Sequence, residues 1–291
     1  MTSNYRSVCL MTLMYSLGVN APLVPIAAHH SPEEVIAHLS SRLETHGNNT
    51  TLLLRRADEW RVLGEPSKAA NDYEHALKLE AMNPLAYLGL ARTRISQKRY
   101  RDAIKMAKRG VALVDTPDAQ AAFHAIVASA HAEMNNHPSA LVAWKAAIDC
   151  ERPEVDWFLG QARTLNNLGL HPAARDALLA ARNRNPSVVL QRAWIDSLIL
   201  CGDFQIAERQ IDAGLQRSHW KSSWLLQRAK LRVARNELIL ARQDAAAALK
   251  EIAIRTTPDV ENPLLEQQQH VAQSLVLKLS QAGPISNSSG N

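Results

Sequence analysis

Small apolar residues recur along most of this chain at a nearly fixed interval. The first residue of the pattern falls at Ala57, Ala91, Ala128, Ala162, Ile195 and Ala229. The successive spacings are 34, 37, 34, 33 and 34 residues. A period of this length predicts a supersecondary unit that is repeated along the chain, each copy stacking on its neighbours.

Two further small positions and one turn position follow in every unit. The second small residue is Ala69, Ala103, Ala140, Ala174, Ala207 and Ala241, and the third is Ala76, Gly110, Ala147, Ala181, Gly214 and Ala248. The turn position reads Gly64, Lys98, Asn135, Gly169, Gly202 and Asn236, and glycine at this position supplies the left-handed conformation that ends the first helix. Small residues let neighbouring helices approach closely, because bulkier ones would overpack by roughly 1–3 kcal/mol. We expect Trp60, Tyr73, Trp144 and Leu178 to fill the larger holes between helices.

The layout resembles the tetratricopeptide repeat (TPR) family, whose unit is a helix, a tight turn and a second antiparallel helix. The clearest unit combines Leu53, Ala57, Trp60, Gly64, Ala69, Tyr73 and Ala76, and Pro84 opens the next unit. The resemblance implies an all-α fold, a right-handed superhelical solenoid of antiparallel helix pairs, with about six repeats and a capping helix at each end. The repeat array is expected over 51–255, in approximate units 50–83, 84–116, 117–153, 154–186, 187–219 and 220–255.

Both ends of the array have helix signals. Ser31, Pro32 and Glu34 form an N-terminal capping signature, which predicts a capping helix within 29–50. Asn262 and Pro263 predict the start of a second capping helix within 260–282. The polar segment 283–291 is expected to be a disordered tail.

The first 28 residues differ from the rest and predict a secretory signal peptide. Arg6 precedes a short apolar stretch, and small residues lead to an expected cleavage near Ala28. This places the mature protein in the periplasm or outside the cell, without a membrane span after cleavage. An uncleaved membrane anchor and a non-targeting leader remain alternatives, which would give a membrane-anchored or cytoplasmic protein.

Composition and charge change this picture little. The chain is 46% hydrophobic, which suffices for a large core, and its net charge of +5 comes from basic residues mixed with acidic ones. Mixed charge indicates a solvated surface more than a phosphate-binding stripe, so no nucleic-acid partner is expected. Cys150 and Cys201 lie too far apart along the array for a disulfide, so buried free thiols are expected.

No catalytic or metal-binding motif is present in the sequence. It lacks a phosphate-binding loop, a nucleophile elbow and a His-Glu-x-x-His pair, and we therefore expect no enzyme activity, no catalytic residue and no cofactor. His124 and His131 lie on one helix face, and packing explains this placement more simply than a metal site does. His29 and His30 leave a metal- or ligand-handling accessory protein as a less favoured alternative.

The resemblance implies that function lies on a concave face lined by the first helix of each unit. Candidate partner-binding residues on that face are Asp58, Arg61, Arg92, Ser129, Arg163, Asn166, Asn167, Asp196 and Lys230. They do not reproduce the Lys, Asn, Asn, Lys and Arg clamp with which some family members grip a carboxy-terminal peptide, so that activity is not carried over. The function expected is a protein- or peptide-binding scaffold or assembly module, with the partner and the oligomeric state undetermined. A cytosolic or membrane-tethered scaffold with the same fold is the alternative.

Overall fold

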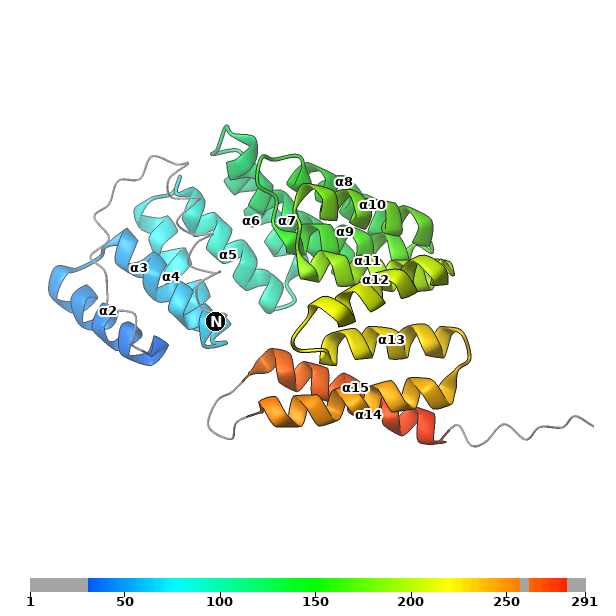
Figure 1. The fold of residues 1–291 in the computed structure, drawn as a ribbon. Coiled ribbons are helices and arrows are strands. Elements are labelled where there is room, and N and C mark those ends of the chain that lie inside the picture. The colour runs from blue at the N-terminus through cyan, green and yellow to red at the C-terminus, as the bar shows by residue number, and fades with distance from the viewer. Residues whose placement is uncertain (1–30, 257–261, 282–291) are drawn as a thin grey trace, which may run out of the picture. The chain divides into compact units, whose positions relative to one another are not determined.

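The computed structural model describes residues 31–256 and 262–281. Within these two ranges the chain forms helices joined by short connections and contains no strand (Figure 1). The prediction of an all-α fold built from helix pairs is confirmed. The predicted signal peptide, the histidines at its end and the C-terminal tail lie outside the described residues. The chain divides into two compact units, 1–169 and 170–291, which are described separately.

Unit 1 holds the first part of the repeat pattern. Its helices are α2 (Pro32–His46), α3 (Thr50–Val62), α4 (Pro66–Leu79), α5 (Pro84–Ser96), α6 (Tyr100–Val111), α7 (Pro117–Glu133), α8 (His137–Ile148) and α9 (Val155–Asn167). Each helix packs against the next one along the chain. In addition α3 packs beside α5, α5 beside α7, and α7 beside α9, so the first helices of the pairs form one layer.

Unit 2 repeats this arrangement. Its helices are α10 (His171–Arg184), α11 (Val188–Cys201), α12 (Phe204–Arg217), α13 (Ser222–Ala234), α14 (Leu238–Arg255) and α15 (Pro263–Gln281). Consecutive helices again pack together, and α11, α13 and α15 pack side by side in that order. The helices α9 and α10, expected to form one repeat, lie on either side of the boundary between the units.

The small positions of the repeat form the contact points between helices. All of them are buried, and none of the alanines at these positions is more than 4% exposed. Gly110 of α6 lies against the Phe123 ring of α7, so closely that an added Cβ would be 2.2 Å from a ring carbon. Among the predicted hole-filling residues, Tyr73, Trp144 and Leu178 are buried. Trp60 is only half-buried, and the exposed Lys68 ammonium lies 4.4 Å from its ring centroid.

The turn position has left-handed backbone geometry in every unit. Gly64, Gly169 and Gly202 have φ between 74° and 80°, and Lys98, Asn135 and Asn236 have φ between 57° and 62°. Glycine adopts this conformation without steric cost, and asparagine adopts it more readily than most other residues. The predicted helix-ending turns are therefore confirmed, including the one at Lys98.

The predicted helix starts at both ends are confirmed. The Ser31 hydroxyl accepts a hydrogen bond from the Glu34 amide, and the Glu34 carboxylate accepts one from the Ser31 amide. The side-chain oxygen of Asn262 accepts a hydrogen bond from the Leu265 amide at the start of α15. Both contacts satisfy amides that the first turn of a helix leaves without a partner.

Equivalent ion pairs join the two helices of the first and last repeats. Arg56 of α3 forms a bidentate contact with Asp72 of α4, at 2.8 and 2.7 Å, and Arg228 of α13 forms one with Asp244 of α14, at 3.0 and 2.8 Å. Both aspartates are buried. The sequence pattern did not reveal these pairs, in which both buried carboxylates are committed to contacts within a repeat.

No disulfide joins Cys150 and Cys201, the two cysteines within the described ranges. Cys150 is buried, as expected, just after the end of α8. Cys201 is only partly buried at the end of α11, where the chain turns, so the expectation of a buried thiol is wrong there.

Candidate functional site

The predicted partner-binding residues occupy one register position on successive first helices of unit 1. Asp58, Arg92, Ser129 and Arg163 each follow a buried small residue, on α3, α5, α7 and α9 respectively. All four are partly or fully exposed, and the helices that carry them are neighbours. We call these four positions the first-helix face. The structure thus gives them a common placement, while their role in binding stays a prediction.

Two of the predicted residues interact with each other and with the core. The buried Tyr73 hydroxyl donates a 2.6 Å hydrogen bond to the Asp58 carboxylate, and Arg61 lies 3.6 Å from the same carboxylate. Burial raises the pKa of Tyr73, and the Asp58 charge raises this pKa further, so the phenol stays protonated as the donor. Asp58 and Arg61 are therefore partly committed to internal contacts.

The two arginines of the first-helix face have side chains that no described residue engages. Within the described chain, no hydrogen bond or ion pair engages the guanidinium groups of Arg92 and Arg163. Asn166 and Asn167 follow Arg163 at the end of α9, where Asn167 is exposed and Asn166 is half-buried. Unengaged guanidinium groups at these positions favour an acidic or hydrogen-bond-accepting partner.

The remaining two predicted residues belong to unit 2 and pair with each other. The Lys230 ammonium of α13 lies 2.9 Å and 3.1 Å from the two carboxylate oxygens of Asp196 on α11. This contact neutralises both charges locally. The nine predicted residues therefore form two separate sets, of which only the set in unit 1 carries unengaged cations.

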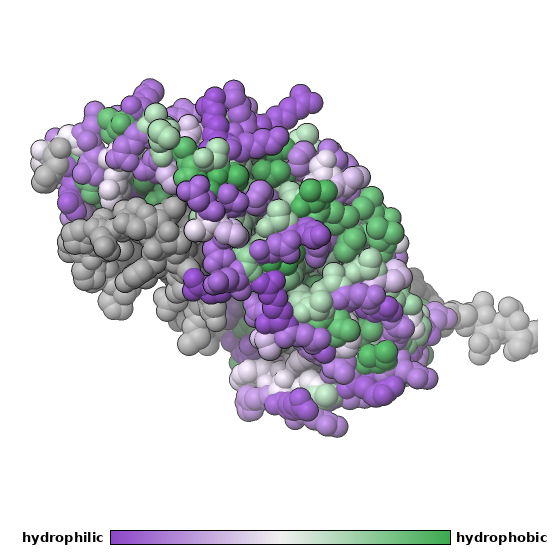
Figure 2. Space-filling view, turned by 90° about the horizontal axis from the view of Figure 1, so that it is seen from above, coloured by the Kyte–Doolittle hydropathy of each residue, from purple (hydrophilic) through white to green (hydrophobic). Residues whose placement is uncertain are grey.

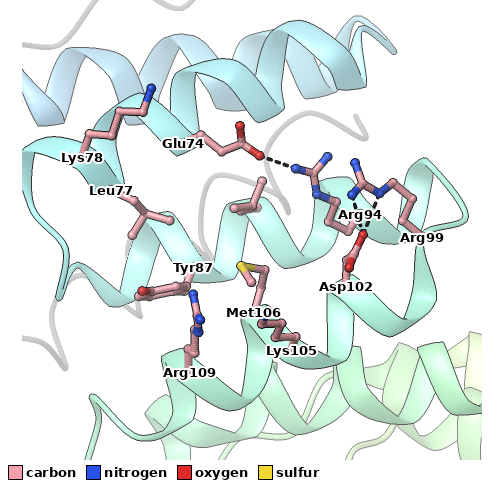
Figure 3. A pocket seen from close by; sticks show the side chains of 11 residues that line it. Glu74, Leu77, Lys78, Tyr87, Arg94, Arg99, Asp102, Lys105, Met106 and Arg109 are labelled. Carbon is pink, nitrogen blue, oxygen red and sulfur yellow. Dashed lines mark hydrogen bonds and ion pairs between the residues drawn. The ribbon is translucent and has the colours of Figure 1, made fainter.

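Unit 1 also contains a cleft between α4 and α6, to which α5 contributes part of the lining and which the sequence pattern did not predict (Figure 3). We call it the α4–α6 cleft. It is open to solvent and has a volume of about 390 Å³. It is lined by Glu74, Leu77, Lys78, Tyr87, Leu90, Arg94, Arg99, Asp102, Lys105, Met106 and Arg109.

The charge of the α4–α6 cleft is strongly positive. Five basic residues and two carboxylates line it, which leaves a net charge of +3. Both carboxylates are already paired: Glu74 accepts a hydrogen bond from Arg94, and Asp102 lies 2.6 Å from the Arg99 guanidinium. No described residue forms a hydrogen bond or ion pair with the side-chain charges of Lys78, Lys105 or Arg109.

The cleft has a signal in the sequence, although only a weak one. Lys105 and Met106 follow Asp102 by three and four residues, and Arg109 follows Met106 by three. Leu77 and Lys78 likewise follow Glu74 by three and four residues. Such spacing places residues on one face of a helix but does not say which face of another helix lies opposite. Three helices from two repeats build this cleft, so the sequence pattern alone did not reveal it.

Other classes of site find little support in the described chain. No cluster of three or more histidine, cysteine or acidic residues able to hold a metal ion occurs within residues 31–256 and 262–281. Over the same ranges, no helix has the length and apolar character needed to cross a bilayer. Partial burial lowers the pKa of His124 and of His131, which disfavours their charged forms.

The outer surface is mixed in character. Figure 2 shows one face of the molecule, on which hydrophilic residues predominate and hydrophobic residues gather in smaller groups. Exposed apolar side chains in the described chain include Val142 of unit 1 and Ile239 and Ile254 of unit 2. Single exposed apolar residues are ordinary on protein surfaces, so they do not define a site by themselves.

No family model matches the sequence, and no curated protein matches it. Solved structures do match. A tetratricopeptide repeat protein from Parabacteroides merdae is 15% identical, with a TM-score of 0.55, covering 84% of this chain and 99% of its own. A chain of the APC/C hetero-tetramer Cut9-Hcn1 is 11% identical, with a TM-score of 0.59, covering 93% of this chain and 52% of its own. Together with the buried small positions and the left-handed turns, these similarities show that this chain has the tetratricopeptide-repeat fold.

Proposed function

We propose that this chain is a non-enzymatic scaffold that holds a protein or peptide partner on the first-helix face of unit 1. The observation that carries the proposal is the pair of unengaged guanidinium groups, Arg92 on α5 and Arg163 on α9, at equivalent positions of one helix layer. The fold supports it, since stacked helix pairs create extended surfaces that suit protein recognition. One similar structure, Cut9-Hcn1, is itself an assembly of two kinds of protein.

Affinity capture with a matched pair of charge-reversed variants tests the proposal. The test variant carries Arg92→Glu and Arg163→Glu on the first-helix face. The control carries Arg101→Glu and Lys108→Glu, two exposed cations of α6 that line neither this face nor the α4–α6 cleft. Circular dichroism first establishes that both variants fold like the wild type.

We expect the wild type and the control to retain a common partner after cross-linking in the native cells, and the test variant to lose most of it. Reversing two partner-facing charges removes two attractive contacts and introduces two repulsive ones. A partner held equally by all three proteins would contradict recognition through the first-helix face.

We further propose that the chain is exported and cleaved near Ala28. The support is the sequence order of one basic residue, a short apolar stretch and small residues ahead of a polar segment. Intact mass spectrometry of the natural protein should then show a mature start close to His29. A mass that includes the first 28 residues would contradict export with cleavage and support the membrane-tethered or cytosolic alternative.

A further inference from the structure

The α4–α6 cleft is a surface distinct from the first-helix face. Leu90 and Arg94 of α5 line the cleft, whereas Arg92 lies two residues from each of them. A helix turns once in 3.6 residues, so two residues correspond to a rotation of about 200°. Arg92 therefore lies on nearly the opposite side of α5, and a ligand in the cleft would leave it free.

Four of the residues that line the cleft are apolar, and we call them its floor. Leu77 of α4, Tyr87 and Leu90 of α5 and Met106 of α6 contribute to the lining. Leu90 is buried, and the other three are partly exposed. Methionine is a flexible and polarisable side chain that adapts to apolar groups of different shape. This floor favours a ligand that brings an apolar side chain with it.

Unengaged cations lie on both rims of this floor. Figure 3 shows Lys78 on the α4 side and Lys105 and Arg109 on the α6 side, with Leu77, Tyr87 and Met106 between them. All three cations are exposed. The ion pairs of Glu74 with Arg94 and of Asp102 with Arg99 gather at the other end of the cleft, so its negative charges are already neutralised.

We propose that the α4–α6 cleft binds an acidic peptide segment in which carboxylates flank an apolar side chain. The apolar side chain packs on Leu77, Tyr87 and Met106, while the carboxylates pair with Lys78 on one rim and with Lys105 and Arg109 on the other. A nucleic-acid backbone fits the site poorly, because phosphate binding relies on a continuous basic track and gains nothing from an apolar floor. The proposed partner surface is independent of the first-helix face.

A peptide titration on the full chain tests this assignment. The probe is a fluorescein-labelled peptide of about twelve residues, made of glutamates around a central pair of leucines, and binding is followed by fluorescence anisotropy. A second peptide has alanines in place of the leucines, and a third has lysines in place of the glutamates. The test variant is Lys105→Glu with Arg109→Glu, and the control is Lys108→Glu on the same helix, outside the cleft lining.

We expect the wild type and the control to bind the leucine-containing acidic peptide equally, and the test variant to bind it at least about tenfold more weakly. The affinity of the wild type should fall as salt is raised from about 50 mM to about 300 mM, because ions screen contacts between exposed charges. The alanine peptide should bind about threefold to tenfold more weakly than the leucine peptide, since it cannot cover the apolar floor. The lysine peptide should not bind.

Three results would overturn the assignment: no binding of the acidic peptide by the wild type, equal binding by the test variant, or equal loss in the Lys108→Glu control. A loss of unfolding cooperativity in the test variant would shift the measurement to Lys78→Glu, on the opposite rim and a different helix. The Arg92→Glu, Arg163→Glu variant should bind the peptide like the wild type. If that variant loses its cellular partner but keeps the peptide, both proposals stand. If the variant keeps both the cellular partner and the peptide, only the proposal that the first-helix face binds the partner is contradicted.

Discussion

Replacing Gly110 with alanine tests the close packing on which the repeat depends. Gly110 is buried near the end of α6, and Phe123 of α7 is 1% exposed. A Cβ at position 110 would lie 2.2, 2.6 and 2.9 Å from three carbons of the Phe123 ring. These distances are well below van der Waals contact, so either the ring or the two helices must move.

The expected cost follows from two opposing effects. Overpacking a dense core costs roughly 1–3 kcal/mol, and the short distances indicate a cost of about 3 kcal/mol at this site. Alanine is the better helix former by about 1 kcal/mol, which offsets part of that cost. We therefore expect Gly110→Ala to lower the free energy of unfolding by about 2 kcal/mol.

Urea unfolding followed by far-ultraviolet circular dichroism measures this difference, and a double-mutant cycle isolates its cause. In a Phe123→Ala background the ring is gone, so Gly110→Ala should stabilise the protein by about 1 kcal/mol. The implied coupling between the two positions is about 3 kcal/mol. If Gly110→Ala leaves the wild-type protein as stable as before, or if its effect is the same in both backgrounds, the close-packing argument is wrong.

Three further predictions test other features of the described chain. Lys98→Gly should raise the free energy of unfolding by about 0.5–1 kcal/mol, because glycine removes the steric cost of the left-handed turn at φ 58°; an unchanged urea midpoint would contradict this. Asp244→Asn should lower the free energy of unfolding by about 2 kcal/mol, since the buried carboxylate partners Arg228 and Arg232; a loss below about 0.5 kcal/mol would show that the pair contributes little. Burial lowers the pKa of His124 and of His131, so near their ordinary pKa the unfolded chain binds more protons than the folded one. The free energy of unfolding should therefore fall as pH drops from about 7.5 to about 5.5, and less steeply when both histidines are glutamine; equal slopes would refute the assignment.

Much of the fold was predictable from the sequence because small residues recur at fixed positions of each repeat. An alanine such as Ala69 or Ala103 recurs wherever two helix backbones approach, and any larger side chain would overpack there. The turn position was equally informative, since only a few residue types adopt left-handed geometry at low cost. Local rules of this kind act within one helix pair and need no knowledge of distant contacts.

The candidate site was only partly predictable. Helical register placed Arg92 and Arg163 on equivalent positions correctly, but it did not show that Asp58 bonds to Tyr73 or that Asp196 pairs with Lys230. Those contacts depend on side chains that reach between helices. Half-burial of Trp60 was missed for the same reason, since it depends on whether a neighbouring side chain or solvent covers the ring.

The sequence by itself determined that this protein is a series of paired helices, where each pair turns, and which residues face the neighbouring helices. Only the tertiary structure decided how charges combine between helices. It pairs Asp196 with Lys230, and it leaves the side-chain charges of Lys78, Lys105 and Arg109, around an apolar floor, without a partner among the described residues. The physical reason is that backbone geometry and small-residue packing act over a few residues. Electrostatic complementarity, by contrast, depends on which side chains meet after the helices have packed.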